Sequence, residues 1–124
     1  MRSGGRDRDF TDFQVIVGSQ TILLPALVGG GRGCVSGLSN LYLKVVNQIF
    51  EAADAGDFDR ALGIQREANE LRQLTGSGIP VSFHHSALRY RGIDIGVPKA
   101  PLMLKTEDEE THILKALRSY THFE

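Results

Sequence analysis

The residues most suggestive of chemistry lie in a glycine-rich stretch from Gly29 to Asn40, GGGRGCVSGLSN. Clusters of this kind can bind phosphate, because a backbone without side chains approaches a ligand closely. Gly31, Gly33 and Ser36 nearly match a dinucleotide fingerprint, but that fingerprint follows a strand and opens a helix. Here the glycines follow a predicted helix and lead into a predicted strand, and the Gly-Lys-Ser/Thr of a P-loop is absent. We therefore interpret them as a helix end and a tight turn.

Other reactive side chains are dispersed along the sequence. His84 and His85 are neighbours in a predicted helix, where their side chains point about 100° apart and cannot share a metal ion. His112 and His122 lack ligand spacing. Cys34 stands inside an apolar run and is interpreted as a buried structural thiol rather than a nucleophile. The sequence thus predicts no metal site and no cofactor.

Composition excludes several classes of protein. The 124 residues are enough for one small domain, and a net charge of −1 gives no broad attraction to nucleic acid or an anionic membrane. No apolar run approaches the ~20 residues that cross a bilayer. The first residues carry no apolar signal region, so export is not expected, and a single cysteine fits a reducing compartment. We expect a cytoplasmic protein without nucleic-acid or membrane partners.

Two short apolar segments predict strands. FQVIV, Phe13–Val17, is a nearly continuous apolar, β-branched run bounded by Gly18, which is typical of parallel strands buried on both faces. CVSG, Cys34–Gly37, is interpreted as a second buried strand. A helix capped by Ser19 or Thr21 and ending at Gly29 connects them; Pro25 fits its first turn if the helix begins near Leu24. Two parallel strands leave open edges, so this sheet looks like part of a larger one.

Four amphipathic stretches follow, each with its own start or stop signal. They run from Leu41 to Gly56, from Phe58 to Thr75 with Asp57 as N-cap and Gly76 as stop, from Pro80 to Gly92, and from a Thr106/Glu109 capping box to about Ser119. The predicted organisation is therefore a flexible lead-in (residues 1–12), two strands with their connecting helix (13–40) and a C-terminal helical region (41–124).

The ordered series of motifs resembles a known family. The first part resembles the seventh and eighth strands of the dihydrodipicolinate synthase and N-acetylneuraminate lyase family, on the stretches FQVIVGSQ and LLPALVGGGRGCVSGLSN. The later part resembles the C-terminal helical region of the same family, on AGDFDRALGIQREANELRQL, RGIDIGVPKAPL and EDEE. The resemblance covers about residues 13–120. It implies an α/β fold: the last two parallel strands of a (β/α)8 barrel followed by C-terminal helices, in a family of class I aldolases.

The resemblance also implies seven substrate-binding positions. They are Gly18, Ser19, Gln20 and Thr21 after the first strand, and Val35, Ser36 and Gly37 at the end of the second. Gln20 replaces an acidic residue that is usual in the family. A neutral amide would not bind a polyol or an amine in the way that a carboxylate does, so the substrate and the subfamily are left open. The residues alone, without the resemblance, favour a turn or strand-end residue with a local hydrogen bond at each position.

No lysine of this sequence matches the catalytic lysine that the resemblance implies. In the family a lysine on the sixth strand forms a Schiff base with pyruvate or another 2-oxo acid. Lys44, Lys99, Lys105 and Lys115 instead fall in predicted helices or a late loop, with no desolvated or cationic setting. We therefore expect a C-terminal fragment of a carbon–carbon lyase, without catalytic residues and inactive alone.

Two kinds of partner are compatible with this sequence. The chain would pair with the missing N-terminal part, or with copies of itself, and the complete enzyme would take a small 2-oxo acid. The alternative is a non-catalytic assembly module that pairs with another chain through its sheet edge.

Overall fold

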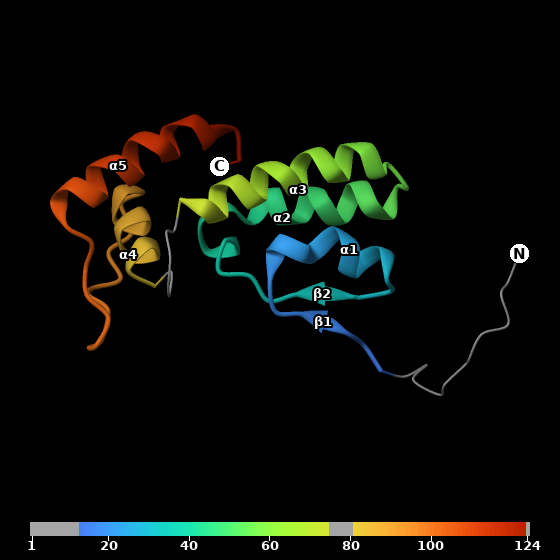
Figure 1. Cartoon of the computed structure of the whole chain (residues 1–124), viewed down its shortest axis with the longest axis horizontal. Coiled ribbons are helices and arrows are strands. Elements are labelled where there is room, and N and C mark those ends of the chain that lie inside the picture. Colours follow the sequence, from blue (N-terminus) through green and yellow to red (C-terminus); the bar gives the residue numbers. More distant parts are fainter. Residues whose placement is uncertain (1–12, 75–80, 124) are drawn as a thin grey trace, which may run out of the picture.

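The computed structural model describes residues 13–74 and 81–123, and within these ranges the chain forms an α/β unit followed by helices (Figure 1). The elements are β1 (Ile16–Val17), the 3₁₀-helix η1 (Gln20–Ile22), α1 (Leu23–Val28), β2 (Gly33–Cys34), α2 (Ser39–Asp54), α3 (Phe58–Gln73), α4 (Val81–Tyr90), α5 (Glu107–Leu117) and the 3₁₀-helix η2 (Arg118–Phe123). The predicted order of elements is confirmed. The predicted lead-in and the signals at Thr75, Gly76 and Pro80 lie outside the described residues.

The two strands are parallel neighbours, as predicted, but shorter. Ile16 pairs with Gly33 and Val17 with Cys34. The predicted first strand, Phe13–Val17, begins three residues too early. The predicted second strand, Cys34–Gly37, begins one residue late and ends three residues late. The second strand ends early because Ser36 already belongs to the turn into α2, where its Oγ accepts a hydrogen bond from the Ser39 N–H at 3.3 Å.

The prediction that the first strand is buried on both faces was also wrong for this chain. Phe13, Val15 and Ile16 are 71%, 55% and 59% exposed. Within the described residues β1 has one neighbouring strand, β2, so its other edge has no strand beside it. Val17, the last residue of β1, is the residue of this strand that packs against the core.

A glutamine on α3 fixes the turn that follows β1. Its Oε1 accepts a hydrogen bond from Leu24 N–H at 2.9 Å, and its Nε2 donates to the Gln20 carbonyl at 2.8 Å. Leu24 lies in the first turn of α1, where backbone N–H groups have no helical partner. This residue, Gln65, is itself buried, and together with Asn69, whose Nδ2 donates to the Thr21 carbonyl at 3.3 Å, it forms what we call the polar clasp.

The clasp explains where α1 begins. Ile22, the residue before the helix, makes no side-chain cap, so the Leu24 N–H depends on α3. Pro25 follows in the first turn and has no N–H to satisfy. The helix therefore begins at Leu23, close to the late start that Pro25 predicted, and the preceding turn with Ser19 as N-cap is 3₁₀.

Helices α2 and α3 form a hairpin that covers α1. Figure 1 shows α1 between the two strands and this hairpin. Gly56, with φ of 73°, makes the turn, and Asp57 caps α3 by accepting from the Arg60 N–H at 3.1 Å, as predicted. Leu23, Val45 and Ile49 lie among the fully buried side chains of the hydrophobic core. None of the helices in the described ranges has the length and apolarity needed to cross a membrane.

Helix α4 is attached to both its neighbours by polar side chains. Arg91, just after the helix, donates to the Leu41 carbonyl beside a kink in α2 and lies over the Tyr42 ring, 5.5 Å from its centre. On the other side, Ser86 Oγ donates to Glu110 Oε1 of α5 at 2.6 Å. These contacts hold α4 against the start of α2 on one side and against α5 on the other.

Replacing the buried glutamine should destabilise the chain strongly. Gln65→Leu leaves the Leu24 N–H without its acceptor in a buried position, at a cost of about 2–3 kcal/mol. Gln73→Leu, an exposed glutamine of the same helix, should change stability by about 0.5 kcal/mol or less. Urea denaturation followed by circular dichroism measures both, and equal losses for the two variants would contradict the role of the clasp.

The predicted capping box of α5 is present and should make this helix sensitive to acid. Thr106 Oγ1 accepts from the Glu109 N–H, and Glu109 Oε2 accepts from the Thr106 N–H at 2.9 Å. The bond from the Thr106 N–H, aided by Lys105, lowers the pKa of Glu109 below its ordinary 4.5. A lowered pKa in the folded state gives stability that is present above pH 4.5 and lost as the pH falls through the folded value.

Glu109→Gln should therefore remove part of the acid dependence of unfolding. Glu107→Gln, in the same turn but outside the box, is the matched control and should keep it. Thermal unfolding between pH 6 and pH 3 measures the difference, and parallel pH profiles for wild type and Glu109→Gln would contradict the assignment.

Candidate functional site

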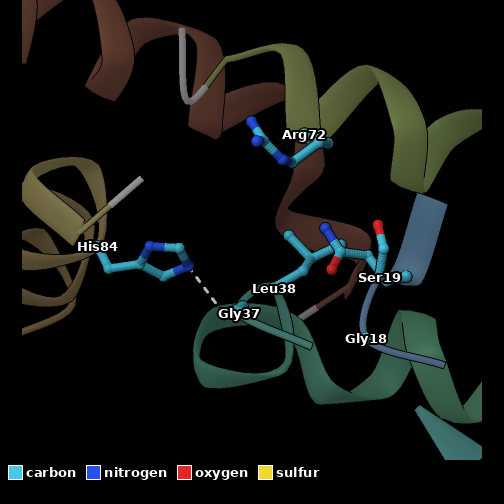
Figure 2. Close-up of a pocket in the computed structure, with 7 residues that line it drawn as sticks. Gly18, Ser19, Gly37, Leu38, Arg72 and His84 are labelled. Atoms are coloured by element: carbon cyan, nitrogen blue, oxygen red, sulfur yellow. Dashed lines mark hydrogen bonds between the residues drawn. The ribbon is translucent and has the colours of Figure 1, made fainter. Parts of the chain in front are cut away.

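A pocket of about 210 Å³ lies where the two parallel strands end (Figure 2). Its walls come from the turn after β1, the turn after β2, the last turn of α3 and the exposed side of α4. The lining residues are Gly18, Ser19, Gln20, Gly37, Leu38, Arg72 and His84. Barrels and open α/β sheets bind their ligands at this end of the strands, so this is the candidate site.

Four of the seven predicted site residues line this pocket, namely Gly18, Ser19, Gln20 and Gly37. The other three do not. Thr21 is outside the lining, and its hydroxyl lies 2.8 Å from Ser19 Oγ. Ser36 is also outside the lining and donates a hydrogen bond to the side chain of Gln20. Val35 is 70% exposed and does not line the pocket. Whether any of the seven binds substrate stays a prediction.

The Gln20 amide is oriented by a short relay of hydrogen bonds. The Ser39 N–H donates to Ser36 Oγ at 3.3 Å, and the Ser36 hydroxyl donates in turn to Gln20 Oε1 at 3.2 Å. The bond from Ser36 occupies one lone pair of the amide oxygen, so the relay fixes the orientation of the Gln20 amide at the pocket wall.

A histidine of α4 closes the pocket from the opposite side. His84 Nε2 lies 2.8 Å from the Gly37 carbonyl oxygen, and since a carbonyl can only accept, Nε2 carries the proton (Figure 2). The ring also stands edge-on to Phe83, with centroids 5.5 Å apart. A Cβ added at Gly37 would lie 3.3 Å from His84 Cε1, so glycine is what lets the imidazole approach.

Sequence reasoning missed three lining residues: Leu38, Arg72 and His84. The two histidines of α4 were considered only as a metal pair; instead His84 binds Gly37 and His85 Nδ1 binds the Gly96 carbonyl, at 2.8 Å each. Gly37 and His84 are 47 residues apart, and Arg72 stands at the end of α3 like many surface arginines. A pattern of neighbouring residues in the sequence does not predict contacts between residues so far apart along the chain.

The described residues include no group of three or more histidine, cysteine or acidic side chains that could hold a metal ion. Cys34, the last residue of β2, is half-buried, and burial raises the pKa of its thiol above 9.0. At neutral pH it is therefore a protonated thiol and a poor nucleophile. Of the lysines, Lys44, Lys99 and Lys115 are exposed and Lys105 pairs with Glu109 at 3.2 Å.

Comparison with known proteins agrees with this geometry. The profile of the dihydrodipicolinate synthetase family matches residues 7–120. The chain is 31% identical over 108 residues to 4-hydroxy-tetrahydrodipicolinate synthase of Exiguobacterium sibiricum, covering 87% of this chain and 37% of that protein. It is 31% identical over 100 residues to N-acetylneuraminate lyase of Clostridium perfringens, covering 80% and 34%.

The solved structures give the same picture. N-acetylneuraminate lyase from Fusobacterium nucleatum complexed with pyruvate superposes with a TM-score of 0.83 at 26% identity, over 90% of this chain and 38% of that one. The chain thus spans a little more than a third of the length of the relatives it matches. With its parallel strand pair, its strand-end pocket and a match over most of its length, the chain belongs to the dihydrodipicolinate synthetase family, as a part of the barrel and its C-terminal helices.

Proposed function

We propose that this chain supplies the closing strands and C-terminal helices of a Schiff-base-forming carbon–carbon lyase that acts on pyruvate or a related 2-oxo acid. The observation that carries the proposal is the pocket lined by Gly18, Ser19, Gln20 and Gly37 at the carboxyl ends of two parallel strands. Catalytic groups of barrel enzymes lie at this face. Family membership and the pyruvate named for the Fusobacterium nucleatum structure support the choice of substrate class.

The chain would contribute binding surface rather than the nucleophile. Imine formation requires an uncharged lysine nitrogen that adds to the keto carbon while water leaves. None of Lys44, Lys99, Lys105 and Lys115 lines the pocket, and Lys105 is paired with Glu109. In the proposed enzyme the amine therefore comes from a segment outside these 124 residues, and this chain alone is inactive.

The exposed side of β1 supports a partner at that place. Phe13, Val15 and Ile16 present apolar surface, and among the described residues no strand lies on the other edge of β1. A further parallel strand on that edge would bury them, as strands of closed barrels are buried. The same edge supports the second candidate, a non-catalytic module that pairs with another copy of itself.

Borohydride trapping tests the proposal. The chain alone, treated with pyruvate and borohydride, should gain no covalent mass on any lysine. Co-expressed with the first six strands of a family barrel, it should form a complex in which a lysine of the other polypeptide is trapped. Lactate, which has no keto group, is the control.

The possible outcomes separate the candidates. An adduct on a lysine of this chain would refute the proposed division of labour. A self-paired chain that never gives an adduct, with or without the other polypeptide, would favour the assembly module.

Crowding Gly37 should displace the histidine on the pocket wall. Gly37→Val places atoms against His84 Cε1 and Nε2, so the imidazole must move and lose its bond to the Gly37 carbonyl, at a cost of about 1 kcal/mol. Gly18→Ala is the matched control, because nothing lies within 4 Å of a Cβ added there. Nitrogen-15 NMR of the imidazole reports the bond; an unchanged Nε2–H signal in Gly37→Val would show the contact to be unimportant.

A further inference from the structure

We propose that Arg91 is a positioning residue of the candidate site: together with His84 it holds the strand-end turn, residues 36–41, in the form that lines the pocket. The turn follows β2 and contributes Gly37 and Leu38 to the pocket wall. The inference rests on the proposed function for the reaction that the pocket serves. It rests on the contacts of α4 for the geometry.

The strand-end turn is not a regular first turn of α2. Leu38, the residue before the helix, makes no side-chain cap, and Tyr42 interrupts the helix with φ of −135° and ψ of 64°. The N–H groups of Leu41 and Tyr42 both donate to the Leu38 carbonyl, at 3.0 Å and 2.8 Å. A non-helical residue interrupts the ladder of hydrogen bonds that makes a helix rigid. The turn therefore requires support from outside α2.

Helix α4 gives this support at both ends of the turn. His84 Nε2 donates to the Gly37 carbonyl at 2.8 Å (Figure 2), and Arg91 Nη1 donates to the Leu41 carbonyl. His84 and Arg91 are seven residues apart, which is close to two turns of helix, so they lie on the same face of α4. One helix face thus contacts two carbonyls that are four residues apart in the turn.

The end of α4 fixes the point from which Arg91 reaches α2. Gly92 has φ of 81°, a conformation that favours glycine, and its N–H donates to the Arg89 carbonyl at 3.0 Å. The Ile93 N–H donates to the Leu88 carbonyl at 2.9 Å. These two bonds form a Schellman motif, which ends a helix at a defined residue. Arg91 is therefore placed by the backbone of the helix end.

The kink residue itself is the second contact of Arg91. The guanidinium carbon lies 5.5 Å from the centre of the Tyr42 ring, within the range of a cation–π interaction, and Tyr42 is buried. A planar guanidinium can donate hydrogen bonds from its edge and stack on an aromatic ring, whereas the ammonium group of lysine is a point charge. Arginine thus suits a site where a carbonyl and a ring are held together.

A displaced turn would change the pocket in two ways. Gly37 and Leu38 would move as lining residues, and Ser36, whose hydroxyl donates to Gln20 Oε1 at 3.2 Å, would move with them. A misplacement of about 1 Å in a site can cost up to 10²-fold in rate or binding. Because the chain supplies pocket wall rather than the amine, we expect the loss of Arg91 to weaken substrate binding more than the chemical step.

The first experiment uses the full nitrogen-15-labelled chain and does not depend on catalysis. Arg91→Met should shift the Gly37 amide signal and speed the exchange of the His84 Nε2 hydrogen with water about tenfold, while the amide of Gly56 in the α2–α3 turn stays unchanged. Arg91→Lys, which keeps the charge, should give a smaller shift. Arg89→Met, which removes the other arginine at this helix end and its 3.6 Å pairing with Glu110, is the control and should leave Gly37 unshifted.

The second experiment measures pyruvate trapping by borohydride in the complex with the first six strands of a family barrel. Arg91→Met should raise the pyruvate concentration that gives half-maximal trapping about fivefold or more, with the yield at saturation unchanged. Arg91→Lys should restore part of the loss. A residue that only stabilised the fold would lower the yield at saturation instead.

The outcomes keep the two proposals apart. An unshifted Gly37 amide in Arg91→Met, or an equal shift in Arg89→Met, would refute the support of the turn by Arg91. A shifted amide with an unchanged half-maximal concentration would refute its role in positioning the site for the reaction. If the wild-type complex gives no adduct, the proposed function fails, and the NMR comparison still decides whether Arg91 holds the turn.

Discussion

The arrangement of the whole site depends on a buried amide on α3. Gln65 joins the turn after β1 to the first turn of α1, by one bond accepted from Leu24 and one donated to Gln20. Buried polar groups of this kind are stable only when all of them are paired, and then they specify a single arrangement. The position of Gln20 in the pocket is thus set from behind, by a helix that begins 38 residues further along the chain.

Two structural layers meet at the pocket. The strands and their turns supply backbone, hydroxyl and amide groups. Helix α3 supplies the guanidinium of Arg72, and α4 supplies the imidazole of His84. Helix α4 is held in place by Arg91 against Leu41 and by Ser86 against Glu110. The C-terminal helices therefore complete the pocket as well as cover the core.

Local signals in the sequence were sufficient for the elements. Asp57 and the Thr106/Glu109 pair marked helix starts because capping is decided by a side chain and the backbone within three residues. Apolar spacing identified the buried faces, as for Val45 and Ile49 of α2. The extent of burial of Phe13 was not predictable in this way, because it depends on which strand lies beside it.

The candidate site was predictable only in part, for the same reason. Gly18, Ser19, Gln20 and Gly37 follow the strands directly, so a strand prediction and a family resemblance suffice to place them. Arg72 and His84 reach the pocket through tertiary packing. Gln65, on the buried face of α3, is a further signal in the sequence. Apolar periodicity does not register a glutamine, but a buried polar residue must have hydrogen-bond partners.

The bond between His84 and Gly37 ties a late helix to an early strand. Nε2 of the imidazole donates to the carbonyl of a residue 47 positions earlier in the chain, in the turn after β2. A displacement of α4 would therefore change the pocket wall and the strand-end turn together.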